Sequence, residues 1–218
     1  MKKSFLIVLF LFCLPQFLFA DENYTNHIQI GPGIGWSFMG INTKAAPDGF
    51  ENWPKFTNSY NASLTLIFPI SNSKKINIIP SFGKIVFPYE IRDAISSDGY
   101  DEVSYFANYL TYGLALTYDN FYFGVDYAYR NGIKMSSTNY GNYSIDKDSV
   151  QNNIILSLGG LVEFWKSKYG SVYCNAGFYY CLNDVYKENP MLGDESFNTK
   201  PISFNVMFSY LFNVYKIY

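Results

Sequence analysis

Residues 103–130 read VSYFANYLTYGLALTY, then Asp119 and Asn120, then FYFGVDYAYR. Large apolar side chains dominate every second position of both arms, and mainly small or polar side chains fill the positions between them. A period of two is that of a β-strand, and only two turn-forming residues separate the arms. The stretch therefore predicts a β-hairpin with a tight turn.

The chemistry of the two faces indicates where this hairpin lies. The large apolar face carries no charge, while the other face holds Gly, Ala, Thr and Tyr with only Asp126 and Arg130. A soluble, half-buried hairpin would place Lys, Glu and Thr on its outer face. A charge-free apolar face favours a continuous apolar surrounding, which a bilayer supplies to every strand at once.

Residues 1–20 have the features of a secretory signal peptide. Lys2 and Lys3 precede an apolar run from Phe5 to Leu14, and the small Ala20 stands before Asp21. The run is too short for a membrane-spanning helix. Removal of the signal peptide leaves 14 basic residues against 18 acids, which gives a net charge near −4. The remaining residues 21–218 are expected to form one domain. Nucleic acid is not expected as a partner.

The same alternation recurs along the chain and predicts eight strands. Short turns follow the second, fourth and sixth strands, and long polar loops at about 42–57, 92–102, 136–148 and 183–200 follow the others. This is the topology of an even-stranded meander closed into a barrel, with all short turns on one rim. The strands are expected at about 27–41, 59–70, 76–91, 103–118, 121–130, 153–165, 172–181 and 202–212.

The third of these strands is the irregular one. Pro80, Gly83 and Pro88 interrupt it, so a bulge is expected there. Lys84 is expected to point inward, away from lipid.

At the level of this pattern, residues 21–218 resemble the small eight-stranded outer-membrane barrels of diderm bacteria, in the broad OmpA and OmpX-like group. The resemblance covers that whole range and rests on no specific residue motif. It implies insertion by the barrel assembly machinery, which in this group recognises a terminal aromatic residue. Phe212 and Tyr218 are the candidates, and Lys216 favours Phe212 because it would face lipid if the strand continued.

A soluble, lipocalin-like barrel is the alternative fold, because alternation alone does not say which face is inside. A lipid-facing Lys or Arg costs about 2 to 4 kcal/mol at mid-bilayer. The apolar faces of seven strands contain neither, and Asp126, Arg130 and Glu163 fall on the small-residue face. Charge placement thus predicts an all-β, eight-stranded antiparallel up-and-down transmembrane β-barrel.

Two cysteines remain after the signal peptide, Cys174 and Cys181. On one strand they face opposite ways and lie about 23 Å apart, beyond disulfide reach. Both are expected to be free thiols. With His27 as the only histidine, neither a metal site built on Cys and His nor a cofactor is expected.

Four charged residues are assigned to the lumen: Lys84, Asp126, Arg130 and Glu163. They could form a gate or a polar path, but eight strands enclose a space that side chains normally fill. A structural network of ion pairs and tyrosines is therefore expected, with Arg130 paired to Glu163 or Asp126.

The long loops hold a second candidate site. Asp93, Asp98, Asp101 and Glu102 could bind a divalent cation that bridges to lipid phosphates, but a solvated acidic loop is the favoured interpretation. Aromatic residues in the loops, including Phe50, Trp53 and Tyr143, offer apolar surface to an extracellular partner or to each other.

Together these features predict a bacterial outer-membrane protein, surrounded by outer-membrane lipid, with a structural or surface-interaction role of the adhesion type and no catalysis. A narrow channel for small or hydrophobic solutes is the alternative. A lipid A modifying enzyme ranks third, because such enzymes use a histidine base. His27 begins the first strand, at the rim of the short turns and away from the outer leaflet.

Overall fold

A computed structural model of the protein describes residues 27–46, 49–71, 76–93, 102–137, 141–186 and 199–217. The predicted signal peptide lies outside these residues and stays a prediction. The described part of the chain contains no helix of the length and apolar character that a membrane crossing requires. The strands are β1 His27–Asn42, β2 Phe50–Trp53, β3 Lys55–Ser71, β4 Ile76–Asp93, β5 Glu102–Tyr118, β6 Phe121–Ser137, β7 Gly141–Ile145, β8 Asn153–Lys166, β9 Gly170–Cys181 and β10 Pro201–Lys216.

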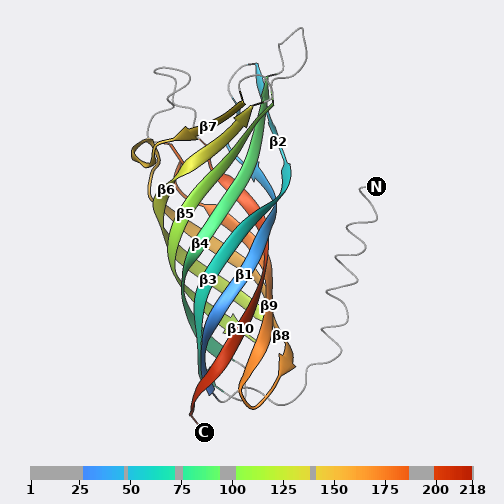
Figure 1. Ribbon diagram of the computed structural model, residues 1–218, viewed down its shortest axis with the longest axis vertical. Helices are drawn as coiled ribbons and strands as arrows, with labels where there is room; N and C mark the ends of the chain where they lie inside the picture. Colours follow the sequence, from blue (N-terminus) through green and yellow to red (C-terminus); the bar gives the residue numbers. More distant parts are fainter. Residues whose placement is uncertain are drawn as a thin grey trace, which may run out of the picture.

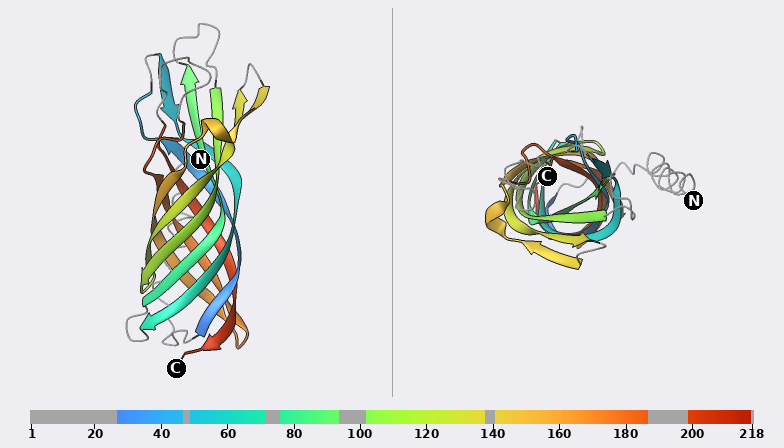
Figure 2. Two further views of the ribbon diagram at one scale, coloured as in Figure 1. Left: turned by 90° about the vertical axis from the view of Figure 1, so that its left-hand side faces the viewer. Right: turned by 90° about the horizontal axis from the view of Figure 1, so that it is seen from above.

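Eight of these strands close into an antiparallel ring (Figure 1). The order around the ring is β1, β3, β4, β5, β6, β8, β9 and β10, and β10 pairs with β1 again. His27 pairs with Lys216, so the first and last strands meet at the lower rim, where the C-terminus and the short connections lie (Figure 2). The predicted eight-stranded, up-and-down transmembrane barrel is confirmed.

Two short strands occupy stretches that the sequence assigned to loops. β2 pairs with the upper end of β4, from Phe50 with Asp93 to Trp53 with Glu90. β7 pairs with the upper end of β6 and lengthens that hairpin beyond the barrel. These segments are short and polar, and they depend on a neighbouring strand for their hydrogen bonds. Their own sequence pattern therefore did not predict them.

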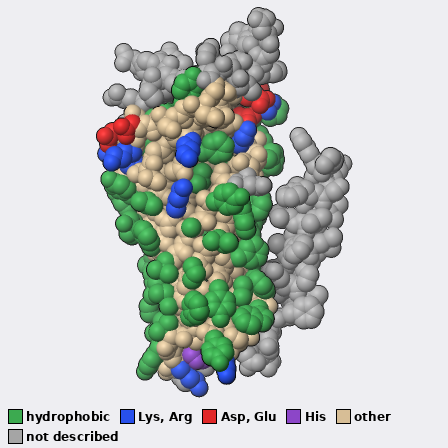
Figure 3. Space-filling view, viewed as in Figure 1, with side chains coloured by type: hydrophobic (Ala, Val, Ile, Leu, Met, Phe, Trp, Pro, Cys, Tyr) green, Lys and Arg blue, Asp and Glu red, His purple; other side chains and the backbone are tan. Residues whose placement is uncertain are grey.

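The apolar faces point outward, as predicted. In the central hairpin, Tyr112, Leu114 and Leu116 of β5 and Phe121 and Phe123 of β6 are exposed. Hydrophobic side chains cover the lower part of the wall, while Lys and Arg side chains lie in the upper part and at the lower end (Figure 3). A strand needs about 9 to 11 residues to cross a bilayer, and these strands have 12 to 18. The upper wall therefore projects beyond the apolar belt.

Trp165 is a correction to the predicted faces. The period of two that places Glu163 in the lumen would place Trp165 there as well, but its side chain is 49% exposed and its ring lies 6.2 Å from that of the outward-facing Tyr210. The register of β8 against β9 shifts between Glu163 and Trp165. This bulge turns the end of the strand outward and places an aromatic side chain at the lower edge of the belt.

The prediction of a bulge in the third barrel strand is also wrong. β4 pairs with β5 without a register shift, from Ile76 with Tyr118 to Arg92 with Glu102. Continuous alternation places Phe82 and Lys84 on the outer face, and both are exposed. The side chain of Lys84 is thus exposed outside, although the residue is part of the strand segment that lines the lumen cavity. It lies one outward position above Phe82, near the upper edge of the belt, where a lipid-facing charge costs little.

Above Lys84, β4 leaves its neighbour β3 and lies against the lumen side of β1. The pairing of β3 with β4 ends at Ala62 and Lys84. Higher up, the Ser37 hydroxyl donates to the Val86 carbonyl at 2.6 Å, and the Val86 N–H donates to Asn61 Oδ1 at 2.9 Å. All seven residues from Ile85 to Ile91 are buried. The strand itself therefore helps to fill the mouth of the barrel.

Two hydrophobic clusters lie inside the barrel at different heights. The lower one joins Ile67, Ile79, Tyr173 and Leu211 near the rim of the short turns. The upper one, here called the plug, is larger and closes the mouth. Its buried members are Ile85, Phe87, Tyr89, Ile91, Ala107, Tyr109, Ala128, Ile133, Met135, Val150, Ile155, Cys181, Val185 and Tyr186.

The inward lean of β4 predicts an unusual sensitivity at Gly40. A Cβ at this position of β1 would collide with the carbonyl oxygen of Pro88. This oxygen belongs to the backbone, so it cannot move aside as the end of a flexible side chain could. Gly40→Ala is expected to destabilise the barrel by about 1 to 3 kcal/mol in urea unfolding from lipid vesicles.

Gly160→Ala is the matched control for this prediction. A Cβ at Gly160 of β8 meets nothing nearer than the Asn120 carbonyl at 3.6 Å, so its effect should stay within about 0.5 kcal/mol. Equal effects of the two substitutions would contradict the close contact between β1 and β4.

Candidate functional site

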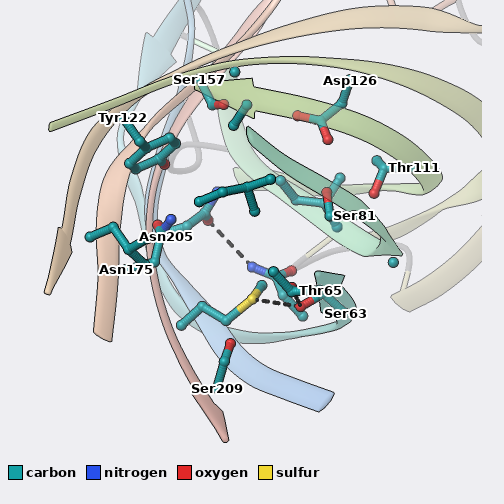
Figure 4. Close-up of a pocket in the computed structure, with 18 of the residues that line it drawn as sticks. Ser63, Thr65, Ser81, Thr111, Tyr122, Asp126, Ser157, Asn175, Asn205 and Ser209 are labelled. Carbon is teal, nitrogen blue, oxygen red and sulfur yellow. Dashed lines mark hydrogen bonds between the residues drawn. The ribbon is translucent and has the colours of Figure 1, made fainter. Parts of the chain in front are cut away.

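A cavity of about 100 Å³ lies in the lumen between the two clusters, and its surface is mainly apolar with polar side chains distributed over it. Strands from all sides of the ring contribute hydroxyl and amide side chains to its wall, together with one carboxylate (Figure 4). The polar side chains include Ser63, Thr65, Ser81, Thr111, Tyr122, Asp126, Ser157, Asn175, Asn205 and Ser209.

Asp126 of β6 provides the carboxylate of this cavity. Its side chain leans across Gly113 of β5, where a Cβ would collide with its Oδ1 and would lie 2.8 Å from the Ser81 hydroxyl. The glycine thus makes room for the carboxylate, which points into the cavity (Figure 4). Among the residues that the structure describes, none donates a hydrogen bond to it and none forms an ion pair with it.

Tyr122 lies on the same strand and leans the other way. Its ring and hydroxyl lie against Gly159 of β8 and Gly177 of β9, two positions where a Cβ would overlap them. The side chain is only 4% exposed, and its hydroxyl has no hydrogen-bond partner in the described part of the chain. The cavity wall therefore carries a buried, unused hydroxyl as well as an unpaired carboxylate.

Glu163 lies lower in the lumen, beside Tyr173 across the β8–β9 pairing. Its Oε1 is buried and has no hydrogen-bond partner among the described residues. The nearby polar groups are already engaged, since the Tyr173 hydroxyl donates to Gln29 Oε1 at 2.7 Å and Gln29 Nε2 donates to Asn213 Oδ1 at 2.8 Å.

Arg130 does not join either carboxylate. Its Nη2 lies 3.0 Å from Oδ1 of Asp148, in the 3-10 segment Lys147–Ser149, and its Nη1 donates to the carbonyls of Asp148 and Val150. The expected pairing with Asp126 or Glu163 is therefore wrong. Arg130 fastens the loop after β7 to the barrel wall, because that loop brings acceptors closer than the lumen does.

The expected lumen network of four charges does not form, since Lys84 is outside and Arg130 is bound to a loop. A different ion-pair cluster occurs at the upper rim, around the buried carboxylate of Glu90. Lys55 Nζ lies 2.8 Å from Glu90 Oε2, and Arg92 Nε lies 2.9 Å from Glu90 Oε1. Arg92 also pairs with Glu102 at 3.0 Å and stacks over the Trp53 ring at 4.2 Å.

This cluster fixes the protonation state of Glu90. Burial alone would raise the pKa of its carboxyl group, but hydrogen bonds from Lys55 and Arg92 outweigh burial and hold the pKa below the ordinary value of 4.5. Glu90 is therefore a carboxylate at neutral pH. It joins β3 to β4 and, through Arg92, joins both to β2 and β5.

The structure describes only part of the predicted loop cation site. Asp98 and Asp101 lie outside the described residues, as does the side chain of Asp93. Glu102 is held by Arg92, which competes with a metal ion for its carboxylate. Within the described ranges, no three His, Cys, Asp or Glu side chains converge in a way that could hold a metal ion. Cys174 and Cys181 are both free, as predicted.

Sequence reasoning missed both Tyr122 and Glu90. Tyr122 was only one of many inward tyrosines, and the facing glycines on β8 and β9 were the available signal. Glu90 lay in the irregular third strand, in which a direction was predicted only for Lys84. Its partner Lys55 lay in a predicted loop, so no sequence spacing connected them.

The Glu90 cluster gives a prediction about pH. A carboxylate with a lowered pKa in the folded state stabilises the fold above its unfolded pKa, and this contribution is lost as the pH falls through the folded value. Glu90→Gln should reduce the unfolding free energy by about 1 to 3 kcal/mol at neutral pH. The gap to the wild type should shrink as the pH falls below about 4.5.

Urea unfolding followed by tryptophan fluorescence at several pH values would measure this gap. Glu51→Gln, at an exposed carboxylate of the adjacent β2, is the control and should shift the curve by no more than about 0.5 kcal/mol. A Glu90→Gln gap that does not change with pH would contradict the role assigned to its charge.

Comparisons with known proteins give distant structural likenesses only. No family model matches the sequence, and no curated protein matches it. The outer membrane protein OprG from Pseudomonas aeruginosa is 8% identical with a TM-score of 0.37, and the alignment covers 89% of this chain and 99% of that one. The translocator domain of the autotransporter NalP from Neisseria meningitidis is 10% identical with a TM-score of 0.31, covering 96% of each chain.

Proposed function

We propose that this protein is a bacterial outer-membrane barrel that does not conduct and that presents its upper wall as an interaction surface of the adhesion type. The observation that carries the proposal is the inward lean of β4, which fills the mouth with the plug while the wall continues above the apolar belt. Such a structure supports a rigid platform better than an open path.

The apolar belt supports the membrane location. Every barrel strand turns large apolar side chains outward, which suits a surrounding of outer-membrane lipid. Export through the predicted signal peptide and insertion by the barrel assembly machinery belong to the same proposal. Phe212, exposed on β10, is the proposed aromatic signal, although β10 continues four residues further to Lys216.

The upper wall has the composition of a contact surface. Phe56 is 64% exposed, Tyr143 is 47% exposed and Trp53 is 39% exposed, and all three lie on strands at or above the level of the Glu90 cluster. The Arg92 guanidinium stacks on the Trp53 ring and restricts its position. Aromatic side chains held on strands lose little conformational freedom on binding, so they suit contact with an extracellular partner.

We also propose that the protein has no catalytic activity. His27, the sole histidine, begins β1 and pairs with Lys216 at the lower rim. It is therefore remote from the outer leaflet, where a lipid A modifying enzyme would need its base.

A narrow channel is the second candidate function, and the lumen cavity beside Asp126 favours it. A solute path would require the plug to move. The main prediction is that the reconstituted protein shows no single-channel steps in planar bilayers. Phe87→Ala combined with Tyr109→Ala should open the mouth and produce steps, because these rings pack edge to face at 6.2 Å within the plug.

Faster gel migration without boiling would show that each sample is a closed barrel before conductance is measured. Phe82→Ala with Tyr112→Ala removes a similar ring pair, at 5.0 Å, from the outer face and is the matched control, which should stay silent. Steps from the wild type would contradict the non-conducting part of the proposal and favour the channel.

The surface role is tested separately with cells. Cells displaying the wild type should settle by self-aggregation and be retained on polystyrene, because the upper wall offers apolar contact. Changing Trp53, Phe56 and Tyr143 to Ser should reduce retention severalfold at equal surface expression. The control variant carries three changes to Ser on the belt, at Leu114, Leu116 and Phe123. Equal retention of cells with the wild type and cells with the upper-wall variant would refute the surface role.

A further inference from the structure

The lumen has an uncompensated negative charge. Below the Glu90 cluster, the described inward-facing charged side chains are Asp126 and Glu163, since Lys84 is on the outer face and Arg130 is bound to Asp148. Burying an ionised carboxylate without a partner is costly, and proteins offset this cost with an ion pair, a bound cation or a proton on the carboxyl group. The two basic residues predicted for the lumen, Lys84 and Arg130, do not pair with Asp126 or Glu163.

Only Asp126 has space and ligands around it for a bound cation. The cavity beside it has a volume of about 100 Å³, whereas Glu163 is not part of its wall. Neutral oxygens form part of its wall, among them the hydroxyls of Ser81, Thr111 and Ser157. The buried Tyr122 hydroxyl lies on the other side of the cavity, against Gly159 and Gly177.

We infer that the cavity beside Asp126 is a binding site for a small monovalent cation. One carboxylate balances one positive charge, and neutral hydroxyl and amide oxygens can replace part of the hydration shell of an alkali ion. Ca²⁺ takes six to eight oxygen ligands, usually with several carboxylates among them, whereas this cavity has one carboxylate.

The cavity is large enough for a small cation. Its volume of about 100 Å³ accommodates such an ion together with several waters. The buried side chains of the plug lie above the cavity, and those of the lower cluster lie below it. Exchange therefore requires local opening, and the ion is best introduced during folding.

The test uses the full barrel, refolded into detergent in the chloride salts of potassium, sodium or N-methylglucamine at equal ionic strength. A bound cation stabilises the folded state by mass action, so the wild type should melt about 3 °C or more higher in potassium or sodium than in N-methylglucamine. Asp126→Asn should reduce this difference to below about 1 °C. Asp119→Asn, in the turn after β5 where φ is 55°, removes the same charge at a position that suits Asn and should keep the full difference.

A second measurement does not depend on the variant folding. Crystals of the wild type grown with thallium(I), a heavy substitute for potassium, should give an anomalous peak beside the Asp126 carboxylate. Equal melting temperatures of the wild type in all three salts would overturn the inference. So would a salt difference that persists in Asp126→Asn, or a thallium peak beside Glu163 and none beside Asp126.

Discussion

The pairing of β1 with β10 is the contact on which the rest of the structure depends. It closes the sheet, so that no strand presents unpaired N–H and C=O groups to lipid. Closure also divides every strand into an outer face, which must be apolar, and an inner face in a narrow space. Gly113, Gly159 and Gly177 follow from that second demand, because their missing Cβ atoms make room for Asp126 and Tyr122.

The inward lean of β4 gives the barrel its other main property. Where this strand leaves β3, side chains alone no longer fill the lumen, because the backbone of β4 lies against the lumen side of β1. The resulting plug closes the mouth and gives the upper wall a solid base. The Glu90 cluster then ties β2, β3, β4 and β5 together above it. Rigid surface and closed lumen thus have one cause.

Basic residues are placed according to what each height of the barrel requires. Lys84 lies at the edge of the belt, where its ammonium group can reach the lipid headgroups. Lys55 and Arg92 neutralise Glu90 at the rim, and Arg130 fixes a loop. None is left for Asp126, and this imbalance makes the lumen cavity a site for a cation rather than a neutral core.

The sequence by itself determined the ring of eight strands, its topology and its outer face, because a period of two and the absence of charge on one face are local properties. It also placed Asp126 and Glu163 on the inner face. It did not determine the partners of the charges, since Arg130 meets Asp148 and Lys55 meets Glu90 only after distant strands pair. The direction of Lys84, the inward lean of β4 and the plug were decided by tertiary structure, because they depend on register and on contacts between strands far apart in the chain.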